Sequence, residues 1–479
     1  MSDVRELIEE IESGPEGPEV GAFFDLDGTL IAGYSANVFY QEFIRRRQMS
    51  PGAIARSVAA GIDMGVRGAD VSRLVEIVAG SFRGHPEDEL VQLGERLFVQ
   101  RIAGMVYPDA RQIVRAHQRK GHTIALASSA TRYQVAPLAA DLDIDHVLTT
   151  ALEVVDGVFT GALGGKVLWG PEKARAVRDF ARTRRVDLRR SYGYGNGDED
   201  MYFLDAVGAP RALNPQAGLA GVAADRGWPA YRLAGRGRPG LEEVVRTGAA
   251  IAGLGTAAAL GVMIGVVNRS RRDGANFATS VGADAALALA GVRLRIIGEE
   301  HLWSQRPAVF IFNHQSSIDM PIVGSLVRRD LTGVAKKEAA RDPRFAPIGF
   351  LVDVAYVDRG NTNQARAALA PVVEKLHQGV SIGIAPEGTR SATPRLGRFK
   401  KGAFHIAMQA GVPIVPIVIH NAGDVMWKGS PLIRKGTVDV SVLEPITTKG
   451  WKAGELDERV TEVRQLYLET LEQWPRLDG

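Results

Sequence analysis

Two carboxylates lie two residues apart directly after an apolar segment near the start of the chain. The run Phe23-Phe24-Asp25-Leu26-Asp27-Gly28-Thr29 follows an expected strand, so both acids emerge on one side of the strand end. Phosphoryl transfer through an aspartyl phosphate needs this pair. One carboxylate attacks phosphorus, the second protonates the leaving oxygen, and Mg²⁺ offsets the negative charge.

Three later residues can complete the same centre. Ser128 ends the apolar segment HTIALAS and can hydrogen-bond a phosphoryl oxygen, and the adjacent Ser129 is the alternative. Lys173 can neutralise a phosphorylated aspartate, and Asp200 can hold the metal ion or its waters. Their order along the chain fits one site.

Together these motifs resemble the haloacid dehalogenase-type phosphatases, in particular the branch with a helical cap after the first motif, over roughly residues 21–232. The resemblance implies Asp25 as nucleophile and Asp27 as acid and base. It implies Ser128 and Lys173 as phosphate ligands. The expected Mg²⁺ ligands are Asp25, Asp27, Asn196 and Asp200.

One position departs from the pattern of that family. Its last motif usually begins with an acidic metal ligand after a glycine, whereas the segment Gly195 to Asp200 reads GNGDED and puts Asn196 there. An amide oxygen is a poorer Mg²⁺ ligand than a carboxylate. Two readings therefore stand side by side: an active phosphomonoesterase, or a folded domain that serves stability or regulation.

A second reactive group follows the apolar segment Pro307 to Phe312. The next residues, 313–319, read NHQSSID, and their two serines suit the start of a helix. Asp319, in the first helical turn, would fix the tautomer of His314 and leave its other ring nitrogen to accept a proton. This pair lacks a nucleophile of its own. The hydroxyl group of a substrate can supply it as His314 deprotonates that hydroxyl for attack on a thioester.

Three further motifs follow in order: Val357-Asp358-Arg359, APEGTRS at residues 385–391 and VPIVP at residues 412–416. With a complete NHxxxxD motif, this series resembles the lysophosphatidic acid acyltransferases of the PlsC type over roughly residues 292–475. The resemblance implies that Arg359 and Arg390 bind the phosphate of the acceptor and that Glu387 helps to position it. The expected substrate-binding residues of this half are Arg359, Glu387, Gly388, Thr389, Arg390 and Lys400.

Lys400 is included because the pair Lys400-Lys401 follows the EGTRS segment and precedes an apolar helix. Solvated lysines are the ordinary interpretation of such a pair. The alternative is that Lys400 returns to the same pocket or meets anionic lipid headgroups.

A stretch of twenty residues without a charge, Gly248 to Val267, is long enough to span a bilayer, although Gly and Ala dominate it. Arginines flank both of its ends, so neither end is expected to be external. We expect a two-helix element, Gly248–Val267 and Asp273–Gly291, that lies on or dips into the cytoplasmic face of the cell membrane. A single span and a buried soluble helix are the alternatives.

The composition bounds the remaining interpretation. The chain has 479 residues, a formal charge of +3 and no cysteine, which indicates two or three globular domains without disulfides or thiolate metal sites. Nothing suggests nucleic acid as a partner. The acidic first twenty residues lack the features of a secretory signal, so the amino terminus is expected in the cytoplasm.

Alternating strand-like and helix-like segments predict two α/β domains, and the stretch AGRGRPG at residues 234–240 marks the linker between them. We expect an acidic leader at 1–20, followed at 21–235 by a Rossmann-like phosphatase domain with a helical cap at about 33–107. The linker and membrane-associated helices should occupy 236–291, and the acyltransferase domain 292–479.

From these motifs we expect transfer of an acyl group from acyl-CoA or acyl carrier protein to the sn-2 hydroxyl of 1-acylglycerol 3-phosphate. The product is phosphatidic acid, the step belongs to phospholipid biosynthesis, and acyl transfer itself needs no cofactor. The expected partners are lysophosphatidic acid, acyl-CoA and membrane lipids. Two alternatives remain: a phosphatase whose second half only binds lipid, and an acyltransferase whose first domain is not catalytic.

Overall fold

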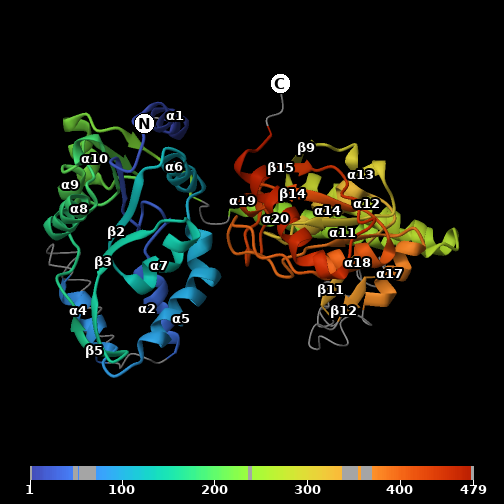
Figure 1. Ribbon diagram of the computed structural model, residues 1–479, viewed down its shortest axis with the longest axis horizontal. Helices are drawn as coiled ribbons and strands as arrows, with labels where there is room; N and C mark the ends of the chain where they lie inside the picture. Colours follow the sequence, from blue (N-terminus) through green and yellow to red (C-terminus); the bar gives the residue numbers. More distant parts are fainter. Residues whose placement is uncertain are drawn as a thin grey trace. The chain divides into compact units, whose positions relative to one another are not determined.

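The chain folds into two compact units, Met1–Gly237 and Arg238–Gly479, in a computed structural model (Figure 1). The structure describes residues 3–46, 52, 72–235, 240–336, 354–357 and 369–475. Each unit is an α/β domain built around its own sheet, so the predicted fold class is confirmed.

The first unit contains a parallel six-stranded sheet in the order β3-β2-β1-β6-β7-β8. Its strands are β1 Gly21–Phe24, β2 Thr123–Thr131, β3 His146–Thr150, β6 Tyr192–Gly195, β7 Ala209–Leu213 and β8 Ala230–Tyr231. The central strand β1 is buried along its whole length, which explains its uninterrupted apolar sequence. Helices α6 Pro108–Arg119, α7 Arg132–Asp141, α8 Pro171–Arg184 and α10 Ala217–Arg226 accompany the sheet.

Among the described residues of the range expected for the cap, helices α2 Ser35–Arg45, α4 Ser72–Ser81 and α5 Glu87–Leu97 lie with a β-hairpin. The hairpin, β4 Leu152–Val155 and β5 Val158–Leu163, comes from much later in the chain, and the sequence analysis did not anticipate it. Figure 1 places α4, α5 and β5 at the end of the unit opposite to α1 Val4–Ser13.

The acidic leader is part of the first unit. Leu7 and Ile11 of α1 are fully buried, and the carboxylates of the leader meet basic side chains of the unit. The ammonium of Lys120, just after α6, donates to the carboxylate of Glu16 over 2.5 Å. The amphipathic spacing of α1 thus gives this segment a docking face on the body of the unit.

In the second unit, the described residues form a seven-stranded sheet in the order β12-β11-β13-β10-β14-β15-β9, in which β14 and β15 pair antiparallel and the other described pairs are parallel. Its strands are β9 Val292–Ile297, β10 Val309–Phe312, β11 Leu331–Lys336, β12 Ala355–Val357, β13 Ser381–Ile384, β14 Ile414–Ile419 and β15 Gly436–Val442. Side chains of β10 alternate between two apolar clusters: Phe310 and Phe312 enter one, Val309 and Ile311 the other. The first cluster includes α14 Asp319–Val327, and the second α17 Ala370–His377, α18 Gly402–Ala410 and α20 Leu456–Glu472.

Two consecutive helices, α11 Leu241–Val267 and α12 Arg271–Ala290, precede this sheet, as predicted, although α11 begins earlier than expected. The two helices pack closely at Gly261 and Gly274. A Cβ atom on Gly261 would lie only 2.6 Å from the carbonyl oxygen of Gly274, so a larger residue would not fit there. Helix α12 also packs on α14, where Gly324 meets Ala283. The helix pair is therefore attached to the core of the second unit.

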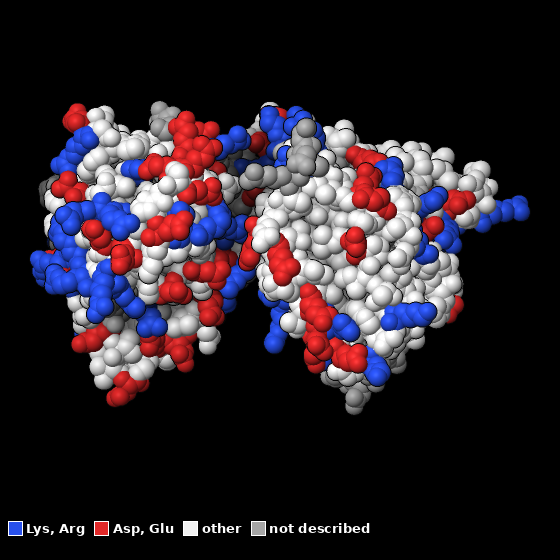
Figure 2. All heavy atoms as spheres, turned by 45° about the horizontal axis from the view of Figure 1, so that its top comes forward, with Lys and Arg blue, Asp and Glu red and all other residues white. Residues whose placement is uncertain are grey.

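Among the described residues, α11 is the one helix whose length and composition would allow it to cross a membrane. One of its faces is buried through Thr247, Ala250, Ala257 and Gly261. Its exposed large apolar side chains are Leu241, Val244, Val245, Ile251, Leu260, Val262, Met263, Val266 and Val267. Figure 2 also shows a broad face of the second unit where charged side chains are sparse, whereas Lys and Arg gather densely on the first unit.

Candidate active sites

The first site lies at the carboxyl end of β1, where the backbone N–H of Asp25 donates to the carbonyl oxygen of Tyr194 in β6 over 2.8 Å. Lys173, near the start of α8, is buried between two carboxylates. Its Nζ lies 2.6 Å from Asp25 Oδ1 and 2.7 Å from Asp200 Oδ1. The structure thus brings together three of the residues singled out in the sequence.

Burial controls the electrostatics of this group. It raises the pKa of Asp25 to about 8, while the Lys173 ammonium acts against this rise and the Asp200 carboxylate adds to it. Burial alone would lower the pKa of Lys173, but the two carboxylates outweigh it and hold that pKa above its ordinary value. The lysine therefore stays charged and can bind a phosphoryl oxygen.

Asp27 is held by the cap. Its two carboxylate oxygens accept hydrogen bonds from the backbone N–H of Ser35 at 2.7 Å and from the Ser35 hydroxyl at 3.2 Å, and Ser35 is the first residue of α2. Burial raises the pKa of Asp27, which favours a protonated carboxyl. A protonated Asp27 is the acid that phosphate ester cleavage requires. The pKa of Asp25 is raised by burial as well, so Asp25 depends on the Lys173 ammonium at 2.6 Å to hold the charge of a nucleophile.

Ser128 is buried near the carboxyl end of β2, and its hydroxyl accepts from the backbone N–H of Ala130 over 3.2 Å. Ser129 is half-buried, and its carbonyl oxygen accepts from the hydroxyl of Thr150. No hydrogen bond in the described part of the chain joins either serine to Asp25. The choice between the two serines stays open.

Asn196 lies against the turn that carries the two aspartates. Gly28 has φ of +82°, and a Cβ atom there would lie 2.1 Å from Asn196 Nδ2. The side chains of Asp25 and Asn196 offer oxygen donors that fit Mg²⁺, which binds proteins through few ligands and keeps several waters. No group of three or more acidic or histidine side chains in the described residues has a metal-binding arrangement.

Asp200, the predicted metal ligand, accepts hydrogen bonds through both of its oxygens. One of its oxygens accepts from Lys173, and the other accepts from the backbone N–H groups of Asn196 at 3.0 Å and Gly197 at 3.1 Å. The carboxylate therefore orients the lysine and the GNGDED loop.

We expect Gly28→Ala to slow phosphate release and to lower the free energy of unfolding by about 1–3 kcal/mol, because the new methyl group strains φ and displaces Asn196. Thermal unfolding and phosphate release with Mg²⁺ and p-nitrophenyl phosphate measure both effects. Gly157→Ala is the matched control, since Gly157 also has positive φ, of +75°, but nothing within 4 Å of a new Cβ. Equal phosphate release in the two variants would contradict the role of Asn196.

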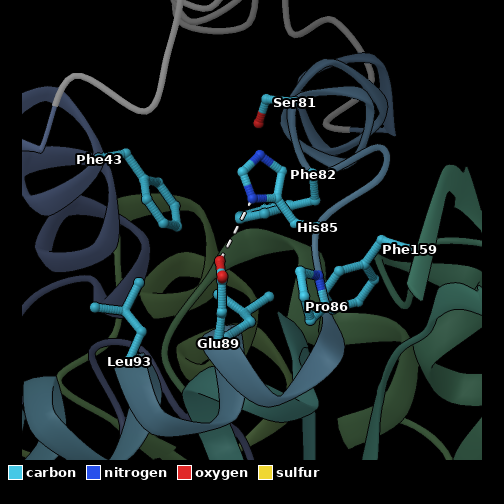
Figure 3. A pocket seen from close by; sticks show the side chains of 9 residues that line it. Phe43, Ser81, Phe82, His85, Pro86, Glu89, Leu93 and Phe159 are labelled. Carbon is cyan, nitrogen blue, oxygen red and sulfur yellow. Dashed lines mark hydrogen bonds and ion pairs between the residues drawn. The ribbon is translucent and has the colours of Figure 1, made fainter. Parts of the chain in front are cut away.

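The cap also encloses a small cavity of about 30 Å³ that the sequence analysis missed (Figure 3). Phe43, Phe82 and Phe159 form an aromatic wall, with ring centroids 5.1 Å apart for the first pair and 5.7 Å for the second. His85 Nδ1 lies 3.5 Å from Glu89 Oε2 at the same place.

The second site contains a histidine whose tautomer is fixed. Asp319 is the first residue of α14, and its Oδ2 lies 2.8 Å from His314 Nδ1. The same oxygen accepts from the backbone N–H groups of Gln315 and Ser316, each over 2.8 Å. Asp319 is fully buried, whereas the His314 side chain is 20% exposed. Its Nε2 has no hydrogen-bond partner among the described residues, which leaves it open to a substrate.

Burial raises the pKa of Asp319, and the hydrogen bond from His314 opposes that rise. Oδ1 of the same carboxylate is buried and has no hydrogen-bond partner in the part of the chain that the structure describes. The carboxylate thus depends on His314 and the two N–H groups for its stabilisation. This dependence locks the ring orientation.

Glu387 joins two segments of the site. Its Oε1 accepts from the backbone N–H of His314, and its Oε2 accepts from that of Gly397, both over 2.7 Å. Burial raises its pKa. Its contacts are with protein backbone, so Glu387 positions the histidine loop rather than reaching a substrate directly.

The PEGTRS turn meets the histidine loop. The guanidinium of Arg390 donates to the hydroxyl of Ser317, and the backbone N–H of Ser391 donates to the carbonyl oxygen of His314 over 2.7 Å. Gly388 has φ of +74°, which lets the turn form, and Thr389 is exposed. Arg359 lies outside the described residues.

Lys400 contacts this turn through its backbone, because its N–H donates to the carbonyl oxygen of Pro386 over 2.8 Å. Its side chain is exposed. Lys401 forms an ion pair with Asp457 at 2.7 Å. A cation that the sequence analysis missed is Lys428, whose Nζ donates to the carbonyl oxygen of Arg390 over 2.8 Å. No motif marks Lys428, because its partner lies 38 residues away.

The first unit has a Rossmann-like sheet that ends in an aspartate–lysine cluster, as in a hydrolase. The second unit is an α/β domain with a histidine–aspartate pair, as in a transferase. Together they define a two-domain enzyme. Comparison with known proteins agrees. Residues 22–205 match the family of haloacid dehalogenase-like hydrolases, and residues 293–420 match the acyltransferase family.

Three curated relatives cover these halves. The chain is 31% identical to the inhibition of morphological differentiation protein of Streptomyces azureus, over 53% of this chain and 95% of that protein. It is 32% identical to a phosphoserine phosphatase of Mycobacterium tuberculosis, over 48% of this chain and 77% of that protein. It is 33% identical to 1-acyl-sn-glycerol-3-phosphate acyltransferase alpha of Ovis aries, over 38% of this chain. The chain spans less than two thirds of this last relative, 63% of its length.

The chain therefore belongs to the haloacid dehalogenase-like hydrolases through its first unit, and it carries an acyltransferase domain in its second. The predicted fusion of these two domains is confirmed.

Proposed function

We propose that this protein transfers an acyl group from acyl-CoA or acyl carrier protein to the sn-2 hydroxyl of 1-acylglycerol 3-phosphate, giving phosphatidic acid in phospholipid biosynthesis. The observation that carries the proposal is the 2.8 Å contact between His314 Nδ1 and a buried Asp319, which leaves Nε2 available as a base. The likeness to a 1-acyl-sn-glycerol-3-phosphate acyltransferase supports this choice of acceptor.

In this mechanism the acceptor hydroxyl attacks the carbonyl carbon of the thioester while His314 Nε2 takes its proton. The carbon–sulfur bond then breaks, and the proton passes from His314 to the leaving sulfur. Asp319 stabilises the imidazolium formed between these steps. Arg390, together with Arg359, binds the phosphate of the acceptor.

The direct test supplies acyl-CoA and 1-acylglycerol 3-phosphate to the full chain and follows phosphatidic acid by mass spectrometry. We expect formation of phosphatidic acid and free thiol in equal amounts. Thiol release without phospholipid product would instead identify a thioester hydrolase.

We further propose that the first unit hydrolyses a phosphomonoester. Asp25 attacks phosphorus, and Asp27 protonates the leaving oxygen. Lys173 binds the phosphoryl oxygens together with Ser128 or the adjacent Ser129. Asp25 and Asn196 would hold Mg²⁺, which offsets negative charge on the phosphoryl group. The aspartyl phosphate is then cleaved by water, with Asp27 as the base.

Two alternatives each have one observation in their favour. The likeness to a phosphoserine phosphatase favours phosphatase as the main activity, with the second unit binding lipid. Asn196, in place of an acidic metal ligand, favours a first unit without turnover.

We propose that the protein works at the cytoplasmic face of the cell membrane through α11. This helix has one face buried on α12 and another that exposes large apolar side chains, which suits a helix lying in the interface. A single span by α11 is disfavoured, because α11 packs on α12 and α12 packs on α14 of the catalytic core.

We expect the double variant Met263→Lys/Val266→Lys to weaken vesicle binding at least about tenfold, since both side chains are more than half exposed on α11 and each would lose its apolar insertion. Flotation with vesicles of phosphatidylglycerol and phosphatidylcholine measures this. Val155→Lys, an exposed valine of the first unit, is the control. Unchanged flotation of the double variant would exclude α11 as the anchor.

A further inference from the structure

Lys428 lies just after the short helix α19 Ala422–Val425, beside the turn that carries Arg390. Its side chain is half-buried, and its Nζ donates one hydrogen bond, to the carbonyl oxygen of Arg390 over 2.8 Å. This is its one hydrogen bond within the described residues, and no described carboxylate pairs with it. Two N–H groups of the ammonium are therefore left for another acceptor.

The segment around Lys428 is tied to the histidine loop as well. The hydroxyl of Ser316 donates to the carbonyl oxygen of Met426 over 2.5 Å. Arg390 in turn donates to the neighbouring Ser317. Lys428, Arg390 and the loop of His314 consequently form one interlocked group, with two cations on it.

The charges of this group are unbalanced. Burial and the nearby Arg390 guanidinium both lower the pKa of Lys428, as expected for two cations held close together. Neither acid of the site forms an ion pair with these two cations. Asp319 is committed to His314 and two backbone N–H groups, and Glu387 to two others. An anionic ligand would relieve the repulsion between the cations.

We propose that Lys428 and Arg390 together bind a phosphate monoester group of a substrate of the acyl transfer. The proposal rests on the proposed function and adds a cation to it. Two substrates bring such a group: the acceptor through its glycerol phosphate, and acyl-CoA through the phosphate on its ribose. A doubly charged phosphate can accept from the Lys428 ammonium and the Arg390 guanidinium at once.

The test is a calorimetric titration of the full-length chain, with every protein carrying Asp25→Asn so that phosphate turnover in the first unit is removed. The probes are glycerol 3-phosphate, which represents the acceptor, and adenosine 3′,5′-bisphosphate, which represents the phosphate end of CoA. We expect Lys428→Gln to bind one of them about tenfold more weakly, and Lys428→Arg to bind it within about twofold of the parent, because arginine retains the charge. The probe whose binding weakens identifies the substrate that the lysine contacts.

Lys449→Gln is the matched control, since Lys449 is an exposed lysine of the same unit. Binding of both probes to Lys428→Gln at parental affinity would overturn the proposal. An equal loss in Lys428→Arg would also overturn it, because it would reduce Lys428 to a tie for the Arg390 turn. These titrations need no acyl transfer, so a failure of the proposed reaction in the wild-type assay is recognised separately.

Discussion

Replacing His314 by alanine should lower the rate of acyl transfer by about 10²–10⁴-fold, the usual contribution of a general base. Nδ1 of His314 lies 2.8 Å from Asp319, which leaves Nε2 free to take a proton. Alanine offers no group that could take the proton of the acceptor hydroxyl. The rate of phosphatidic acid formation from acyl-CoA measures the effect. Phosphate release by the first unit should be unchanged in the same protein.

Two controls separate chemistry from folding. His377→Ala removes an exposed histidine of the same unit and should retain full acyl transfer. Asp319→Asn keeps the size of the side chain but replaces a carboxylate oxygen, which accepts hydrogen bonds, by an amide that can also donate them. It should therefore lower the rate of acyl transfer without an equal rise in KM. Acyl transfer at the wild-type rate in His314→Ala would contradict the role of His314 as base.

This pair was predictable because its geometry is local. Asp319 follows His314 by only five positions, and a strand followed by a helix start is enough to bring their side chains together. The strands β1 and β10 were predictable for a similar reason, since buried parallel strands are continuous apolar runs. Local sequence was thus enough to predict the fold class and the pairing of His314 with Asp319.

Other features depend on contacts between distant segments. The β4–β5 hairpin follows β3 in the chain, yet it packs on α4, which comes before β2. The spacing of Leu7 and Ile11 suits one face of a helix, but the sequence did not show which surface would cover that face, because a short amphipathic helix needs a partner surface to fold. Tertiary packing decided these elements.

The same reason explains what was missed in the sites. Glu387 was expected near the acceptor, but its two oxygens hold backbone N–H groups, one of them 73 residues away at His314. Asp200 was expected to hold metal, and its motif gave no sign that its carboxylate would also accept hydrogen bonds from Lys173 and two N–H groups. A motif names a side chain, whereas its hydrogen-bond partners follow only from the folded chain.

Replacing Asp25 by asparagine should reduce phosphate release at least about 10³-fold, because the amide cannot form the aspartyl phosphate. The substitution should not destabilise the unit. Burial already disfavours the charge of Asp25, raising its pKa to about 8, and the amide oxygen can still accept from Lys173. Phosphate release from p-nitrophenyl phosphate and thermal unfolding test both statements, with Asp179→Asn, an exposed acid of α8, as the control.

The comparison also decides between a working and a silent first unit. Equal phosphate release from Asp25→Asn and the wild type would place the activity elsewhere and contradict Asp25 as nucleophile. If the wild type releases no phosphate, Asn196→Asp becomes the decisive variant, since it restores a carboxylate beside the Gly28 turn. Release gained by that variant at millimolar Mg²⁺ would locate the defect in metal binding, because Asp25 and Lys173 are already in place.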